Sequence, residues 1–269
     1  MLRLSSLRLS SPRLSSPRRS LSRLSLSLAL LLAFRVAAIA VLLSLAVQPV
    51  AAQDQRQGEP GKFDFYVLSL SWSPSYCDTS RERYADRTPD QQCTTRPYSF
   101  VVHGLWPQYE EGFPSYCQVP APRLDRGVVA SMLDLMPSPR LIFHEWDRHG
   151  TCSGLSARAY FETVRKARAV VKIPPEYLAL NEALTIAPTE IKEAFLKVNP
   201  SLPQDAIAVA CDNKRLTEVR ICVSKEFGFH ECAQTVARAC KRDKIVMPPL
   251  RQKSSTADAR QAEVQQEPK

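Results

Sequence analysis

The chain has 269 residues and a formal net charge of +9, from 36 Lys and Arg against 27 Asp and Glu. Seven of the arginines and none of the acids lie in residues 1–52, so the rest of the chain carries a net charge of only +2. Bulk charge therefore gives no argument for a polyanionic partner. The roughly 200 residues that follow suit one domain with a sizeable core.

The first residues have the pattern of an export signal. Residues 1–35 are almost entirely Leu, Ser, Arg and Pro, and they lead into the apolar run Val36–Val47 and the small residues Val50 and Ala52. An apolar run of about a dozen residues is too short for a comfortable membrane span, so we expect cleavage after Ala52, with an uncleaved anchor as the alternative. The expected parts are a leader at 1–52, one domain at 53–249 and a disordered polar tail at 250–269.

Two strand patterns follow the leader. Residues 63–72 are apolar and aromatic with partial alternation, and residues 99–106 have a buried-strand pattern that ends near Gly104 and Pro107. Long loops are predicted from the Pro-rich and polar segments 73–97 and 107–126.

Helical patterns come next and strands return at the end. Helices are predicted at 127–136, 139–149, 156–171 and 188–200, the last with Thr189 as its cap. The segments AIAVAC at 206–211 and TEVRICV at 217–223 alternate as two strands of a hairpin around DNKR. Strands, then helices, then strands predict an α+β fold with a central antiparallel sheet flanked by helices.

All eight cysteines lie beyond the leader, at positions 77, 93, 117, 152, 211, 222, 232 and 240. An even count in an exported chain indicates disulfides formed in an oxidising compartment. A zinc site is the alternative, but no two cysteines have the C-x-x-C spacing of zinc ribbons. We therefore expect four bridges, for which spacing alone leaves about 105 connectivities.

Residues 144–152 read HEWDRHGTC, one residue away from the zinc-protease signature H-E-x-x-H. His144 and His149 are five residues apart, so on a regular helix they point about 140° away from each other and cannot share one metal ion. Glu145 is instead three and four residues from Arg148 and His149, which makes these side chains neighbours. The segment can present imidazole, carboxyl and guanidinium groups to one cleft.

His103, in FVVHGLWP, is expected to reach the same cleft from the end of a strand. Two histidines with a cation and a carboxyl suit proton transfer with stabilisation of charge on a phosphoryl or acyl oxygen. No G-x-S-x-G segment and no odd cysteine supports a nucleophilic enzyme. At a helix C-terminus, His149 is expected to have a raised pKa, and His230 is interpreted as a packing or surface histidine.

FVVHGLWP at 100–107 and HEWDRHGTC at 144–152 resemble the two active-site segments of the ribonuclease T2 family of secreted RNA endonucleases. The resemblance covers about residues 61–245. It implies metal-independent cleavage of single-stranded RNA with low base specificity, through 2′,3′-cyclic phosphates and further to 3′-phosphates. No cofactor and no metal is expected, because the attacking group is the substrate's own hydroxyl.

The resemblance also implies a role for each residue of the two motifs. His149 is the general base on the ribose 2′-OH, His103 the general acid on the 5′-oxygen, and His144 a phosphate ligand, while Glu145 and Arg148 stabilise the pentacovalent transition state. The family most often has Lys where Arg148 stands, and Arg keeps the charge with a different geometry. Trp106 and Tyr109 are expected to stack on a base, with packing as the alternative.

The cysteine pairs that the resemblance implies are Cys77–Cys93, Cys117–Cys152, Cys211–Cys240 and Cys222–Cys232. The protein is expected to be exported, periplasmic or secreted, and monomeric, with RNA as its partner and no membrane contact after signal cleavage. Two alternatives stay open: an exported RNA-binding or signalling protein with a decayed site, and a zinc hydrolase. The complete set of motif histidines argues against the first and the five-residue spacing against the second.

Overall fold

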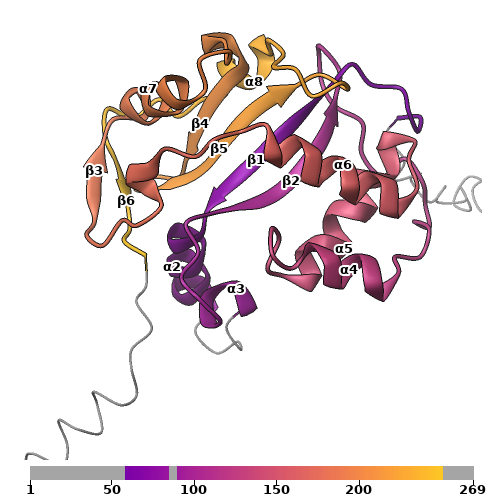
Figure 1. Cartoon of the computed structure of the whole chain (residues 1–269), viewed down its shortest axis with the longest axis horizontal. Helices are drawn as coiled ribbons and strands as arrows, with labels where there is room; N and C mark the ends of the chain where they lie inside the picture. The colour runs from indigo at the N-terminus through magenta and orange to yellow at the C-terminus, as the bar shows by residue number, and fades with distance from the viewer. Residues whose placement is uncertain (1–57, 85–89, 251–269) are drawn as a thin grey trace, which may run out of the picture. The chain divides into compact units, whose positions relative to one another are not determined.

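A computed structural model describes residues 58–84 and 90–250; the expected leader lies outside these residues, as does nearly all of the expected tail. Four antiparallel strands form the central sheet in the order β2-β1-β5-β4 (Figure 1). Their bounds are β1 Phe65–Trp72, β2 Phe100–Gln108, β4 Ile207–Cys211 and β5 Leu216–Val223. This confirms the predicted α+β fold with a central antiparallel sheet.

One face of this sheet is apolar and packs into the main core. Leu68 and Leu70 of β1 and Val219 and Ile221 of β5 are fully buried there. Because side chains alternate along a strand, the intervening residues of β5 point to the opposite face. That second face is the one that carries polar side chains.

The predicted helices form and cover the apolar face of the sheet. They are α4 Arg126–Met132, α5 Pro139–Arg148, α6 Ala157–Ala169 and α7 Pro188–Val198, and each contributes residues to the core. The predicted Thr189 cap is wrong, because the N-cap of α7 is Ala187 and Pro188 takes the first helical position, where its missing N–H is not needed. The Glu190 carboxylate accepts the Ala187 N–H at 2.9 Å.

Short elements complete the chain. They are the 3₁₀ helices η1 Gly150–Ser153, η2 Pro175–Tyr177 and η3 Gln204–Ala206, the helix α8 Ala233–Ala237, and the two-stranded sheet of β3 Leu184–Ile186 and β6 Ile245–Met247. Within the part of the chain that the structure describes, no helix is both long and apolar enough to cross a membrane.

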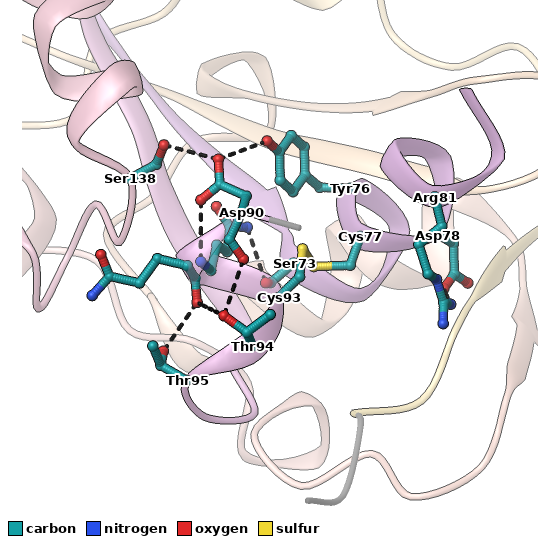
Figure 2. Close-up of a disulfide and its surroundings, with 12 residues drawn as sticks. Ser73, Tyr76, Cys77, Asp78, Arg81, Asp90, Cys93, Thr94, Thr95 and Ser138 are labelled. Atoms are coloured by element: carbon teal, nitrogen blue, oxygen red, sulfur yellow. Dashed lines mark hydrogen bonds and ion pairs between the residues drawn. A yellow bond between two sulfur atoms is a disulfide. The ribbon is translucent and has the colours of Figure 1, made fainter. Parts of the chain in front are cut away.

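The loop predicted at 73–97 is in part wrong, because the chain forms α2 Ser73–Arg83 and α3 Gln91–Thr94 there. Only the beginning of α2 is buried, so it has no apolar stripe to reveal it. A disulfide and polar contacts hold this region in place of core packing. Cys77–Cys93 joins the two helices, and the Asp90 side chain caps α3 (Figure 2).

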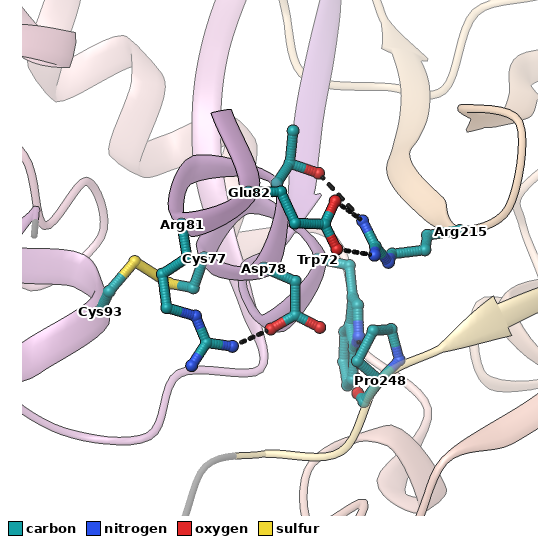
Figure 3. A network of polar contacts seen from close by, with 9 residues as sticks. Trp72, Cys77, Asp78, Arg81, Glu82, Cys93, Arg215 and Pro248 are labelled. Atoms are coloured by element: carbon teal, nitrogen blue, oxygen red, sulfur yellow. Dashed lines mark hydrogen bonds and ion pairs between the residues drawn. A yellow bond between two sulfur atoms is a disulfide. The ribbon is translucent and has the colours of Figure 1, made fainter. Parts of the chain in front are cut away.

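Polar contacts tie α2 to the start of β5, and the end of β1 to the C-terminal segment. Glu82 of α2 pairs with Arg215, just before β5, and the Trp72 indole donates a 3.0 Å hydrogen bond to the Pro248 carbonyl (Figure 3). The four disulfides are Cys77–Cys93, Cys117–Cys152, Cys211–Cys240 and Cys222–Cys232, which are the pairs that the resemblance implied.

Candidate active site

A β-bulge sets the direction of His103. In the pairing of β1 with β2, Ser69 lies opposite Gly104 but Leu70 lies opposite Val102, so His103 has no partner of its own in β1. Such an extra residue changes the phase of the strand and re-aims side chains. Val102 stays in the core while His103 reaches the polar face of the sheet.

Gly104 makes room for a side chain of α5. A Cβ at this position would lie 1.9 Å from Oε2 of Glu145 and 2.5 Å from the indole nitrogen of Trp106. Those two atoms meet each other instead, since the Trp106 N–H donates a 2.7 Å hydrogen bond to Glu145 Oε2. The glycine after His103 is therefore required by the close approach of helix and strand.

The helix α5 divides its residues between the core and the site. Ile142 and Trp146 are buried in the main core, and Glu145 is buried between the helix and β2. His149 is the C-cap of the helix, and the residue after it, Gly150, leaves no space for a Cβ beside the Trp146 ring. Core packing of one helix side thus fixes the motif side chains on the other.

All five predicted catalytic residues line one cavity of about 300 Å³. Trp106 lines it too, whereas Tyr109 does not and instead packs half-buried against the core. Sequence reasoning did not name the other residues of the wall, which are Val67, Gln108, Phe113, Arg220, Gln234, Thr235 and Arg238.

Two carboxylates flank the His103 ring. Its Nδ1 is 2.6 Å from Glu218 Oε1, and its Nε2 is 3.6 Å from Glu145 Oε1. Burial disfavours the charged ring, but the hydrogen bond and charge of Glu218, with the charge of Glu145, outweigh it and raise the His103 pKa. Burial likewise opposes ionisation of Glu218, yet His103 and Arg220 lower the pKa of Glu218 to about 2.

His149 favours its neutral form, in contrast to His103. It is buried, and burial together with the positive charges of Arg148, His144 and His103 lowers the pKa of His149 to about 3. The expectation of a pKa raised by the helix dipole is wrong, because burial, together with the charge of Arg148 and of the neighbouring imidazoles, outweighs that weak field. The cavity therefore holds one imidazole that favours its charged form and one that favours its neutral form.

Burial raises the pKa of Glu145 to about 7, although the charge of His103 and the hydrogen bond from Trp106 oppose the shift. Its neighbour Glu218 is pushed the other way. Two carboxyl groups whose pKa values are driven apart mark a site in which each has its own task. Among the described residues, no three His, Cys, Asp or Glu side chains are grouped to hold a metal ion.

The residues missed by sequence reasoning differ in whether a signal existed. The alternation of TEVRICV already placed Glu218 and Arg220 on one face of a strand, opposite Val219 and Ile221. That face pattern was the available signal. Phe113 lies outside the helices and strands and gave none.

The Ribonuclease T2 family model matches residues 63–232. The chain belongs to the ribonuclease T2 family. It is 40% identical over 131 residues to the ribonuclease of Aeromonas hydrophila, a match that covers 48% of this chain and 57% of that one. It is 34% identical over 155 residues to a probable ribonuclease of Haemophilus influenzae, covering 53% and 57%. The matches thus span less than two thirds of these two relatives.

Among solved structures, the chain is similar to RNase NT in complex with 5′-AMP, with a TM-score of 0.54 and 28% identity over 70% of this chain and 100% of that one. The part that matches the ribonuclease T2 family begins just before β1 and ends at Cys232. It therefore includes both motif segments and β5, whereas α8, which forms part of the cavity wall, follows it.

Proposed function

We propose that this member of the ribonuclease T2 family is a metal-independent endoribonuclease that cleaves single-stranded RNA with low base specificity. The observation that carries the proposal is the pair of histidines in one cavity with opposite proton preferences. His103, with its raised pKa, holds a proton that it can donate, and His149, with its lowered pKa, is neutral and has a ring nitrogen free to accept one. General acid–base catalysis needs both at once.

In the first step, neutral His149 takes the proton of a ribose 2′-OH, and the 2′-oxygen attacks the adjacent phosphorus. His103 gives its proton to the 5′-oxygen as the phosphorus–oxygen bond breaks. The products are a 2′,3′-cyclic phosphate and a free 5′-hydroxyl. DNA lacks the attacking hydroxyl and is not cut.

In the second step, water attacks the cyclic phosphate and the roles reverse. Neutral His103 takes a proton from the water, and charged His149 returns a proton to the 2′-oxygen. The product is a 3′-phosphate, and both histidines regain their starting forms. The same two groups therefore serve transphosphorylation and hydrolysis.

The remaining motif residues act on the phosphate. Arg148 lines the cavity with its guanidinium 5.7 Å from the centre of the Tyr116 ring, and His144 lines it from one turn earlier on α5. The Arg148 guanidinium binds phosphate oxygens as charge develops on them, and His144, whose pKa is lowered by burial and by the charge of Arg148, donates a ring N–H to the same oxygens. Below about pH 7, Glu145 is largely protonated and donates a hydrogen bond to the same phosphoryl group.

Phe113 is the surface that we propose for base stacking. It lines the cavity and is 36% exposed, whereas the Trp106 ring already contacts His103, His149 and the Arg220 guanidinium. Stacking tolerates any base, which suits low specificity. The similar RNase NT was solved in complex with 5′-AMP, and we propose that the cavity described here also accepts a nucleotide. Stacking on Trp106 or Tyr109 stays a prediction.

We also propose that the protein is exported, to the periplasm or out of the cell, and acts as a monomer. Four disulfides form and persist in an oxidising compartment. The basic and apolar leader supplies the route.

The test uses a DNA oligonucleotide with a single ribonucleotide, an all-DNA strand and a strand whose one ribose carries a 2′-O-methyl group. We expect cleavage of the first alone, at the ribonucleotide, with a 2′,3′-cyclic phosphate identified by mass spectrometry and no loss of rate in EDTA. Cleavage of the all-DNA strand, or loss of activity in EDTA, would contradict the mechanism.

His103→Ala and His149→Ala should each lower kcat by about 100-fold to 10,000-fold, the usual worth of a general acid or base. The matched control is His230→Ala, since His230 lies outside the cavity with its Nε2 3.2 Å from Glu110. It should leave kcat unchanged. Near-normal turnover in either cavity variant would show that the acid and base are assigned wrongly.

A further inference from the structure

We propose that Glu218, held by Arg220, is the positioning residue that fixes the His103 imidazole for its part in the reaction. This inference rests on the proposed function. Glu218 Oε1 lies 2.6 Å from His103 Nδ1, and Glu218 is not among the residues that line the cavity. It therefore acts through His103 and not on the substrate.

The contact determines which nitrogen of His103 faces the reaction. An ionised carboxylate only accepts hydrogen bonds, so His103 Nδ1 must carry a proton and donate it. The other nitrogen, Nε2, is left as the one that exchanges a proton with the substrate. A carboxylate behind a catalytic histidine fixes tautomer and ring direction in the same way in serine proteases.

Arg220 holds the carboxylate from its other side. Its Nε and Nη2 donate to Glu218 Oε2 at 2.9 and 2.8 Å, so each oxygen of the carboxylate has a partner. Such charge-assisted contacts from a planar guanidinium fix position as well as charge. The Arg220 guanidinium also lies 5.3 Å from the centre of the Trp106 ring, which places the pair against the wall of the cavity.

The sheet leaves room for this pair. The residues opposite Glu218 are Ser71 in β1 and Ala210 in β4, and those opposite Arg220 are Ser69 and Ala208. Directly opposed residues share a face of the sheet, so two long charged side chains stand among four small ones. Glu218 and Arg220 can therefore lie along the face and meet His103 on β2.

Charged groups from two elements face His103. From β5 these are Glu218 and Arg220, and from α5 and its C-cap they are Glu145, His144 and His149. Arg220 opposes the charged form of His103, whereas His144 and His149 have lowered pKa values and favour their neutral forms beside it. Glu145 has its own pKa raised to about 7, so below that pH it supplies little negative charge. The negative partner of His103 in acid and neutral solution is Glu218.

The test is the pH profile of Glu218→Gln against that of Glu82→Gln. Glu82 also pairs with an arginine beside β5 but has no contact with His103. In Glu218→Gln we expect kcat/KM to fall about tenfold or more, and its alkaline limb to move about one pH unit or more to lower pH. Glu82→Gln should keep the wild-type profile. A Glu218→Gln variant whose kcat/KM falls equally at every pH would overturn the proposal.

A measurement on the wild-type protein separates this inference from the proposed function and does not depend on a variant that folds. ¹⁵N and ¹H NMR of the histidine rings should show that His103 titrates above the ordinary 6.5 and that its neutral form keeps the proton on Nδ1. A neutral form with the proton on Nε2 would overturn the positioning role, even in an active enzyme. If His103 titrates as expected, with its proton on Nδ1, but the protein does not cut RNA, the proposed function alone would be overturned.

Discussion

Two arginine–glutamate pairs lie at β5, and they differ in what surrounds them. Glu82 pairs with Arg215 at the start of the strand with its side chain 58% exposed (Figure 3), whereas Glu218 pairs with Arg220 inside the protein with its side chain 11% exposed. Water screens the Glu82 carboxylate, so the first pair acts on little beyond itself. The Glu218 carboxylate is desolvated and acts on His103, while its partner Arg220 reaches the cavity wall. Burial thus turns an ordinary ion pair into part of a site.

Two carboxyl groups, of Asp90 and Glu145, also differ in how many hydrogen bonds they accept. Asp90 accepts hydrogen bonds from the Tyr76 hydroxyl, the Ser138 hydroxyl and the Gln92 N–H at 3.1, 3.0 and 3.2 Å (Figure 2). Glu145 is more deeply buried and accepts one, from Trp106. The well-bonded carboxylate holds helices together, and the poorly bonded one is left with a raised pKa for chemistry.

Among changes that test this contrast between structural and catalytic carboxyl groups, the largest effect should come from filling the space between β2 and α5. Gly104→Ala places a methyl group where Glu145 Oε2 now lies, 1.9 Å away, so Glu145 and the adjacent His103 must shift. We expect kcat to fall on the order of 100-fold or more, as for a misplacement of about 1 Å. The check is steady-state cleavage of the single-ribonucleotide strand.

Its matched control is Gly228→Ala, where the nearest atom to the new methyl group is Ser224 Oγ at 3.7 Å. That variant should keep its kcat. An active Gly104→Ala would mean that helix and strand can separate without cost to the site.

A smaller effect should appear in stability. The pKa of Glu145 is about 7 in the folded state against 4.5 unfolded, so its contribution is fully present below pH 4.5 and is lost as pH rises through 7. The shift corresponds to about 3 kcal/mol. Glu145→Gln removes this titration. Between pH 5 and pH 8 the wild type should therefore lose free energy of unfolding relative to the variant, as urea unfolding at each pH would measure.

The exposed carboxylate provides the control for this experiment. The hydrogen bond from Arg215 lowers the pKa of Glu82, so Glu82 is ionised in both states over most of this range, and Glu82→Gln should run nearly parallel to the wild type. Parallel curves for Glu145→Gln as well would show that Glu145 is not held protonated by burial.

Much of the fold and of the candidate site could be predicted from the sequence, and part of each could not. The periodic apolar residues of β5 and α5 predicted both elements, and helical spacing on α5 also brought Glu145, Arg148 and His149 together. Glu218 and Arg220 were missed, although the alternation of β5 set them on one face. The helix α2 was missed because a disulfide and surface ion pairs hold it, and these leave no apolar pattern. The pKa of His149 was misjudged because burial depends on which segments pack over it, which no local pattern records.

The smallest effect should come from the satisfied carboxylate, Asp90. Asp90→Ala removes the cap of α3 and the acceptor for the Tyr76 hydroxyl, which should lower the free energy of unfolding by about 1 kcal/mol. Burial and the Asp90 charge raise the pKa of Tyr76 to about 12; without Asp90 it should fall toward 10, as a phenolate absorbance titration would show. Cleavage should stay unchanged, because Asp90 contacts no residue of the cavity wall. A large loss of kcat would mean that the network around Cys77–Cys93 supports the active site after all, and that satisfaction of hydrogen bonds does not separate structural carboxylates from catalytic ones in this protein.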